Sequence, residues 1–238
     1  MDLKPNPNKK LIIEINGKKL ARYPVKTRLI TSEDKDISIV VEEYVKKHPA
    51  YAGGLLAEDI VFVSEKTVAV TQGRSYHLND VKVSWLAEKL SSHVTRTPVG
   101  IGLGSPQTMQ LAIDEVGILR ILIATIIGGF FRVLGIRRVF YIIAGNKARS
   151  IDGAVDYAIY PYNKYVSKGP INANGVAKKI SDKLGGVKVA IVDANDIGVN
   201  ILGSTPDLDR KFVARAIKDN PLGQTNECTP VGILREVK

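Results

Sequence analysis

Short runs of apolar and β-branched residues recur along the chain between polar and amphipathic stretches. Such runs of about four to eight residues, bounded by glycine, proline or asparagine, are typical of strands. Asn16-Gly17 separates two of these runs and predicts a tight hairpin turn. The predicted strands cover residues 10–15, 18–24, 59–70 (holding two short strands), 139–144, 187–192 and 231–234.

Helical periodicity, with apolar residues three and four positions apart, marks several of the stretches between these strands. Residues 37–45 fit this spacing, and Ser32 or Asp34 is expected to cap that helix. Another helix is predicted to begin with Ser105 as its N-cap and Pro106 at the first helical position. Further helices are predicted at residues 85–94, 176–184 and 209–218.

Residues 118–134 form the most apolar part of the chain. The uncharged stretch between Arg120 and Arg132 has eleven residues. As a helix it spans about 16 Å, whereas the core of a bilayer is about 30 Å thick, so a membrane span is not expected. Burial in the core or in a subunit interface is favoured. The alternative is a membrane-surface element anchored by arginines at positions 120, 132, 137 and 138.

Residues 187–203 change from apolar to polar within one residue. A buried strand is predicted up to Val192, and the oxygen-bearing side chains Asp193, Asn195 and Asp196 follow it in a turn. Carboxylates at the end of a rigid strand are often catalytic or metal-binding. An Asx-rich turn, whose side chains bond only their own backbone, explains the same pattern equally well.

Composition narrows the classes of function. The 238 residues, 45% of them hydrophobic, suffice for one large domain or two small lobes. The single cysteine, Cys228, excludes an internal disulfide and favours a reducing, cytoplasmic setting. The sequence contains no zinc pattern, Walker A motif or G-x-S-x-G motif. A net charge of +10 favours nucleotides, polyanionic small molecules, nucleic acid or a membrane surface, although a solvated lysine-rich surface gives the same total.

Oxygen-bearing and basic groups at predicted strand ends are the remaining candidates for chemistry. Asp152 and Asp193 follow apolar residues, and two converging carboxylates suit Mg²⁺ or Mn²⁺. Lys66 and Arg74 flank a predicted strand and are candidates to neutralise phosphate oxygens. Residues 223–229 offer consecutive N–H groups for an anion. Solvated turns remain the simpler interpretation for each of these residues taken singly.

Taken together, and in chain order, these motifs resemble the coenzyme F420-0:L-glutamate ligase family over most of the sequence. Residues 23–36 resemble the family's opening strand and acidic helix start, and residues 59–74 its "GD-x-apolar … K … S-K-x-E-G-R" stretch. Ala144-Gly145 with Ile151-Asp152 resembles "N-A-G-I-D" with residues inserted. Residues 189–195 are similar to "apolar-T-D-T-N-G-R", and 223–230 to the loop "G-E-G-x-x-x-x-P".

The resemblance implies a mixed α/β fold, an intertwined homodimer and one ligase-like domain over residues 1–238, with an apolar insertion at about 117–139. It implies a cytoplasmic enzyme that joins L-glutamate to an anionic acceptor such as coenzyme F420-0, with GTP as co-substrate. Asp152 and Asp193 match the family's Mg²⁺ or Mn²⁺ ligands. In the ligase hypothesis Lys66 and Arg74 are the expected catalytic residues, as cations that steady phosphate oxygens. The positions that match its GTP contacts are Leu29, Ile30, Thr31, Ser32, Glu65, Lys66, Gly223, Gln224, Thr225, Asn226, Glu227, Cys228, Thr229 and Pro230.

Several positions depart from the family pattern. Val70 replaces a lysine, Gln72 and Gln224 replace glutamates, and Ala194 replaces a threonine. A ligase that uses an acyl phosphate is the leading hypothesis, with GTP and ATP both open as the nucleotide. A non-catalytic nucleotide- or anion-binding protein on the same fold is the second hypothesis. A basic protein that binds RNA or a membrane surface is the third, although nucleic acid is not an expected partner of the ligase.

Overall fold

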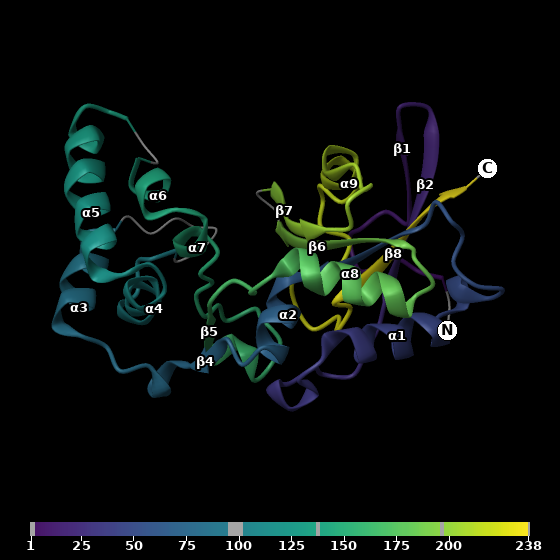
Figure 1. Cartoon of the computed structure of the whole chain (residues 1–238), viewed down its shortest axis with the longest axis horizontal. Coiled ribbons are helices and arrows are strands. Elements are labelled where there is room, and N and C mark those ends of the chain that lie inside the picture. Colours follow the sequence, from purple (N-terminus) through teal and green to yellow (C-terminus); the bar gives the residue numbers. More distant parts are fainter. Residues whose placement is uncertain (1–2, 95–101, 137–138, 196–197, 238) are drawn as a thin grey trace. The chain divides into compact units, whose positions relative to one another are not determined.

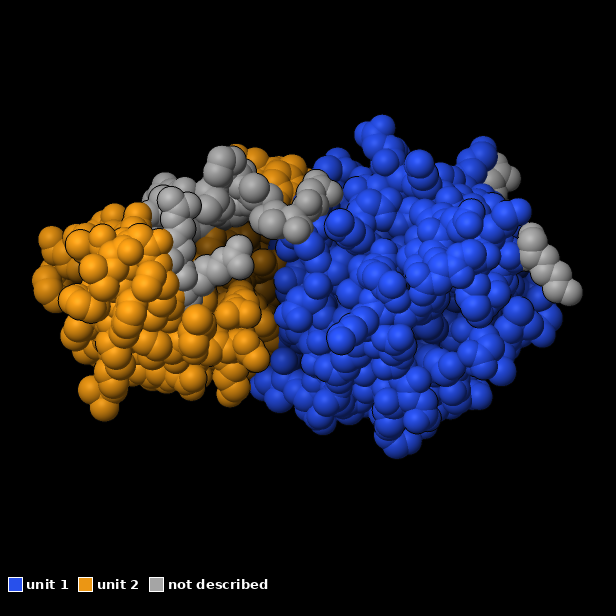
Figure 2. All heavy atoms as spheres, turned by 90° about the horizontal axis from the view of Figure 1, so that it is seen from above, with its two compact units in different colours: residues 1–73, 170–238 blue, residues 74–169 orange. Residues whose placement is uncertain are grey.

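The computed structural model describes residues 3–94, 102–136, 139–195 and 198–237, which fall into two compact units. Unit 1 combines residues 1–73 with residues 170–238, and unit 2 comprises residues 74–169 (Figure 2). Unit 2 is therefore inserted within the chain of unit 1. The apolar segment expected as an insertion, residues 117–139, belongs to unit 2.

A six-stranded mixed sheet runs through the described part of unit 1 (Figure 1). Its order is β1-β2-β8-β3-β6-β7, in which β3 and β6 are parallel and the other neighbours are antiparallel. The strands are β1 (Ile12–Ile15), β2 (Lys18–Val25), β3 (Ile60–Ser64), β6 (Lys188–Asn195), β7 (Gly198–Ser204) and β8 (Val231–Val237). The hairpin predicted at Asn16-Gly17 is confirmed, because Ile15 pairs with Lys18.

Helices pack on both faces of this sheet, because its central strand presents apolar side chains to both sides. Val61 and Val63 of β3 join one apolar cluster, whereas Ile60 and Phe62 join another, as the two-residue period of a strand requires. Side chains of α1 and α8 complete the first cluster, and those of α9 complete the second. The helices of unit 1 are α1 (Ile37–Lys47), α2 (Glu65–Thr71), α8 (Ala173–Lys183) and α9 (Arg210–Ala216).

The start of α1 corrects one prediction. Asp36 caps the helix, and its carboxylate accepts a hydrogen bond from the Ser38 N–H at 3.1 Å. The predicted caps, Ser32 and Asp34, instead belong to the short 3₁₀ helix η1 (Ser32–Asp34), which Thr31 caps. Several residues with oxygen-bearing side chains precede α1 in the sequence. The N-cap is the one directly before the first helical residue, and the sequence pattern does not specify where the helix begins.

Unit 2 is mainly helical. Its helices are α3 (Trp85–Ser92), α4 (Pro106–Val116), α5 (Ile118–Val133), α6 (Val139–Ala144) and α7 (Asn146–Arg149), and β4 (Ser75–His77) pairs antiparallel with β5 (Tyr165–Ser167). The predicted start of α4 is confirmed, because Ser105 caps it and Pro106 is its first residue. A separate apolar cluster forms the core of this unit, with Leu103, Met109 and Ile121 fully buried at its centre.

Two predicted strands are helices in the structure. In residues 59–70, only the first strand forms as β3, and the second half is α2. Residues 139–144 form α6, which packs against α5. Both are short apolar runs, whose periodicity does not separate a strand from a buried helix. In unit 2 the helix α6 packs closely against α5, since a Cβ added to Gly128 of α5 would lie 2.9 Å from the Cβ of Phe140.

The most apolar helix is largely exposed, contrary to the expectation of core burial. In α5 only Ile121 and Ala124 are buried. Leu119, Ile126 and Val133 are 73%, 72% and 88% exposed. No single described helix is long and apolar enough to cross a membrane; α4 and α5 pass that test only together, with a bend of 117° between them.

Candidate functional site

The sheet of unit 1 brings the predicted nucleotide-binding segments to one edge. Strands β3 and β6 are parallel, with Ser64 opposite Val192. Glu65 and Lys66 therefore follow β3 at the same end of the sheet at which β6 reaches Asp193. Ligands of open α/β sheets bind outside the carboxyl ends of parallel strands, and this pair supplies such an edge.

Two further predicted segments reach the same edge through β8 and β2. Val231, at the start of β8, pairs with Val63 on one side and with Val25 on the other. Residues 223–230 lead directly into β8, and the Ser64 N–H donates to the Pro230 carbonyl at 2.8 Å. Residues 29–32 follow β2 and are tied to the loop, because the Thr27 N–H donates to the Cys228 carbonyl at 2.9 Å. Four segments from distant parts of the sequence thus meet at one end of the sheet.

The loop of residues 223–230 is ordered by its own side chains. Glu227 accepts hydrogen bonds from the Thr225 N–H at 2.7 Å and from the Thr225 hydroxyl at 2.8 Å. The buried Thr229 hydroxyl donates to the Leu222 carbonyl at 2.6 Å. Burial raises the pKa of the Cys228 thiol, so it is a poor nucleophile at neutral pH. The Nε2 atom of Gln224 is buried and has no hydrogen-bond partner among the described residues, so it is a donor available to an incoming oxygen.

The segment that follows β2 is held by an ion pair. The Arg28 guanidinium binds the Asp34 carboxylate, and Asp34 also accepts a hydrogen bond from the Thr31 N–H at 2.7 Å. The hydrogen bond from Arg28 lowers the pKa of Asp34 in spite of its partial burial. Ile30 is buried in the core of unit 1, which anchors this segment beside the sheet edge.

Asp193 lies within β6, so the turn predicted to begin there starts later. It pairs with Asn200 of β7. The Asn195 amide donates to the Asp193 carboxylate at 3.3 Å, and the Asn195 oxygen accepts from the Gly198 N–H at 3.2 Å. Asp196, the third residue of the predicted acidic turn, lies outside the described residues. Asp193 is half-buried, and a rigid strand rather than a loop holds its carboxylate.

Asp152, the other predicted metal ligand, belongs to unit 2 and follows α7 rather than the predicted strand. Its backbone forms an isolated bridge with Ser167, with N–H to carbonyl distances of 2.9 and 3.0 Å, and the residue is exposed. Within the described ranges no three His, Cys, Asp or Glu residues cluster as a metal cage. The carboxylates that are present suit a Mg²⁺ ion bound together with substrate phosphates rather than a metal ion held by protein side chains alone. Mg²⁺ commonly keeps several waters and takes only one or two protein carboxylates beside substrate phosphates.

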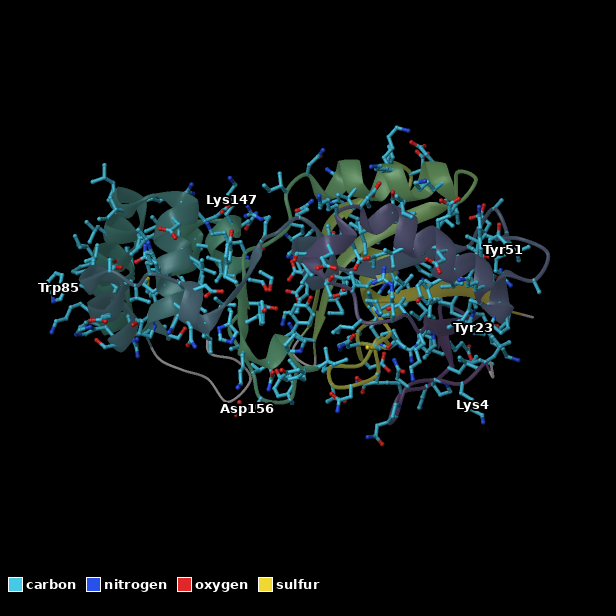
Figure 3. The ribbon with its side chains drawn as sticks, turned by 90° about the horizontal axis from the view of Figure 1, so that it is seen from below. Lys4, Tyr23, Tyr51, Trp85, Lys147 and Asp156 are labelled. Atoms are coloured by element: carbon cyan, nitrogen blue, oxygen red, sulfur yellow. The ribbon has the colours of Figure 1, made fainter. Side chains whose placement is uncertain are left out.

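A basic cluster surrounds one carboxylate in unit 2. The Glu115 carboxylate lies 2.9 Å from Nη2 of Arg74, 3.5 Å from Nζ of Lys168 and 3.7 Å from Nζ of Lys147. Side chains of Glu115, Arg74 and Lys168 are 11–13% exposed, whereas that of Lys147 is 73% exposed and lies at the surface (Figure 3). Arg74 also donates from Nε to the Gly169 carbonyl at 2.7 Å. Three cations around one anion leave a local charge of about +2, which suits an anionic ligand.

The Glu115 carboxylate is ionised within this cluster. Burial by itself raises its pKa, but the hydrogen bond and charge of Arg74, together with the charges of Lys168 and Lys147, outweigh burial and lower the pKa. Sequence reasoning identified Arg74 and missed Glu115, Lys147 and Lys168. These residues are spread over residues 74–168, and only folding brings them together.

Two positions where the chain departs from the ligase pattern have defined roles in the fold. Val70 is 4% exposed within α2, so an apolar contact occupies the position that matches a lysine. Gln72 forms a two-way bond with the backbone of Ile171, donating to its carbonyl at 2.9 Å and accepting from its N–H at 2.7 Å. Both residues therefore stabilise unit 1.

Comparison with known proteins identifies the family of the chain. The family model described as F420-0:Gamma-glutamyl ligase matches residues 24–197, which cover most of both units. The chain belongs to this family. A search of curated proteins finds no match.

Proposed function

We propose that this protein is a nucleotide- and metal-dependent γ-glutamyl ligase that forms an amide between L-glutamate and the carboxylate of an anionic acceptor such as coenzyme F420-0. The observation that supports it best is the convergence of residues 29–32, 64–66, 193–195 and 223–230 at one edge of the sheet. These segments are distant in sequence and match the family's nucleotide and metal contacts in order. We further propose, from the resemblance alone, a homodimer with the site near its boundary.

The proposed reaction has two steps. An acceptor carboxylate oxygen attacks the γ-phosphorus of GTP, forming an acyl phosphate and releasing GDP. The glutamate amine then attacks the acyl carbon, inorganic phosphate leaves with the acyl C–O electron pair, and the amine loses one proton. Little of this chemistry requires a protein nucleophile, so catalysis rests on positioning and on neutralising charge.

Named residues have distinct parts in this proposal. Lys66 and Arg74 bind phosphate oxygens, and Glu115 holds Arg74 in place through its carboxylate. The loop of residues 223–230 covers the nucleotide, with backbone N–H groups and the Gln224 amide as donors. From the resemblance alone, Asp193 and Asp152 would hold Mg²⁺ or Mn²⁺, which would supply positive charge to the transferring phosphate.

One experiment tests the nucleotide-binding and metal-binding parts of this proposal. The melting temperature of the full chain is measured with GTP, ATP and Mn²⁺, because a ligand that binds only the native state raises stability. We expect a shift with nucleotide and Mn²⁺ together that Asp193→Asn reduces. The control is Asp182→Asn, which changes an exposed carboxylate of α8 that pairs with Lys178. It is expected to show the same shift in melting temperature as the parent. If Asp193→Asn binds metal and GTP as the parent does, the metal assignment is wrong.

A non-catalytic nucleotide- or anion-binding protein is the competing function. The buried apolar side chain of Val70 and the backbone bonds of Gln72, at positions that match a lysine and a glutamate of the family, favour it. Phosphate release from GTP or ATP, measured with L-glutamate and coenzyme F420-0, decides between the two. Release that requires both the amino acid and the acceptor supports the ligase. Nucleotide binding without release supports the binding protein.

A further inference from the structure

Helix α5 presents two different sides. Ile121 and Ala124 point into the core of unit 2 and are fully buried. On the other side Leu119, Ile126 and Phe130 are 73%, 72% and 63% exposed. We define the α5–α6 face as the exposed apolar residues of these two helices and their connection: Ile118, Leu119, Ile123, Ile126, Ile127, Phe130, Val133, Leu134, Ile136 and Ile142.

This face accounts for a large share of the chain's exposed apolar side chains. Among the residues that the structure describes, ten of the eighteen exposed large hydrophobic residues belong to it, and they fall within 25 consecutive positions. Soluble surfaces scatter such residues singly, whereas a continuous patch marks a surface that another molecule covers. By contrast, Ile39 of α1 and Trp85 of α3 (Figure 3) are each the single exposed large hydrophobic residue of their helix.

The charges around the face indicate the kind of partner. From Val116 to Ile151 the sequence contains no aspartate or glutamate and six cations: Arg120, Arg132, Arg137, Arg138, Lys147 and Arg149. Unit 2 as a whole has twelve basic and six acidic residues, so it carries +6 of the net charge of +10. A partner that covers this face must therefore combine apolar character with negative charge.

A second copy of the chain fits these charges poorly. A two-fold interface brings the same patch of both copies together. The arginines of the two copies would meet around the apolar centre, and the segment has no carboxylate of its own to pair with them. An anionic lipid surface offers acyl chains to the apolar residues and phosphate groups to the arginines, which is how interfacial helices bind.

The dimensions favour a helix that lies on the membrane. The sixteen residues of α5 extend about 24 Å, less than the roughly 30 Å needed to cross a bilayer core. Helix α4, which precedes α5, carries Asp114 and Glu115. It buries Met109, Leu111 and Ala112 in the core of unit 2, so it does not form a membrane span together with α5. We propose that the α5–α6 face docks on an anionic lipid bilayer, with its apolar side chains among the acyl chains and the exposed Arg120 and Arg132 of α5 at the level of the headgroups.

Vesicle co-sedimentation of the full chain tests this proposal directly. Vesicles of phosphatidylcholine alone are compared with vesicles that contain phosphatidylglycerol as well. We expect the chain to bind the anionic vesicles more strongly, and salt to weaken binding because it screens the arginines. Replacing one inserted aromatic side chain, in Phe130→Glu, is expected to lower partitioning about tenfold to a hundredfold.

The control is Ile39→Glu, which introduces the same charge at a residue of α1 that is 55% exposed. It is expected to bind vesicles as the parent does, and far-UV circular dichroism confirms that both variants are folded. Equal binding of Phe130→Glu and the parent would overturn the proposal, and so would equal partitioning into neutral and anionic vesicles. A parent dimer that Phe130→Glu dissociates, with no vesicle binding, would also overturn it and assign the face to a second copy. None of these results tests nucleotide binding, which the melting-temperature experiment measures separately.

Discussion

The basic cluster of unit 2 allows one prediction to be worked out in energetic terms. Glu115→Gln keeps the shape of the side chain and removes its charge. At an effective dielectric constant of about 20, the Arg74 contact at 2.9 Å contributes a gross attraction of about 6 kcal/mol and the Lys168 contact at 3.5 Å about 5 kcal/mol. Desolvation of the three groups and repulsion between the two cations offset most of this attraction.

The net cost is estimated from the burial of the partners. Removing one member of a fully buried ion pair costs roughly 3–5 kcal/mol. The side chains here are 11–13% exposed, and the glutamine oxygen still accepts a hydrogen bond. We therefore expect Glu115→Gln to lower the free energy of unfolding of unit 2 by about 2 kcal/mol.

Urea unfolding measures this change. Trp85, the single tryptophan of the chain, belongs to α3 and reports on unit 2, whereas far-UV circular dichroism follows the helices of both units together. Asp114→Asn, an exposed neighbour on α4 that accepts a hydrogen bond from Gln110, is the matched control. Its effect is expected to stay within about 0.5 kcal/mol. If Glu115→Gln costs no more than this control, the cluster does not stabilise the unit and the reasoning is wrong.

The pH dependence of the same pair of proteins provides a second check. The folded state lowers the pKa of Glu115 below its ordinary value of 4.5. A carboxyl group with a lowered pKa adds stability above its unfolded pKa, and this stability is lost as the pH falls through the folded pKa. The difference between the parent and Glu115→Gln should therefore be full near neutral pH and shrink as the pH falls below about 4.5.

Two further predictions concern unit 1. Gly203→Ala should destabilise the unit by about 1–3 kcal/mol, because its Cβ would lie 2.3 Å from the backbone carbon of Ala173. Gly198→Ala, with nothing within 4 Å of the new Cβ, is the control, and equal urea midpoints would contradict the close packing. Asp219→Asn should cost about 1–2 kcal/mol, because it removes the counter-charge of Arg22, whose side chain is only 1% exposed, while the Asp219 side chain is 48% exposed and solvent already screens the pair in part. This loss should shrink at high salt without disappearing, since salt screens the exposed carboxylate more than the buried guanidinium, and a variant with the urea midpoint of the parent would refute the prediction.

Local signals explain what could be predicted from the sequence. The turn at Asn16-Gly17 and the start of α4 at Ser105 and Pro106 depend on residues within a few positions of each other, and both are confirmed. The choice of Asp36 as the cap of α1 required the exact start of the helix, which composition does not specify. The strand predicted at residues 139–144 is wrong, because a short apolar run suits a strand and a helix alike, and these residues form α6, which packs against α5.

For the candidate site, too, some features follow from the sequence and others only from the tertiary structure. The sequence by itself determined which segments carry polar and charged groups, that residues 118–134 are strongly apolar, and, through motif order, the family to which the chain belongs. Only the tertiary structure decided that four separate segments meet at one edge of the sheet, because strand order and direction are set by long-range pairing. It likewise decided that Glu115 collects three distant cations. It also decided that α5 buries one side and exposes the other, since burial depends on which side of a helix has a neighbour to pack against.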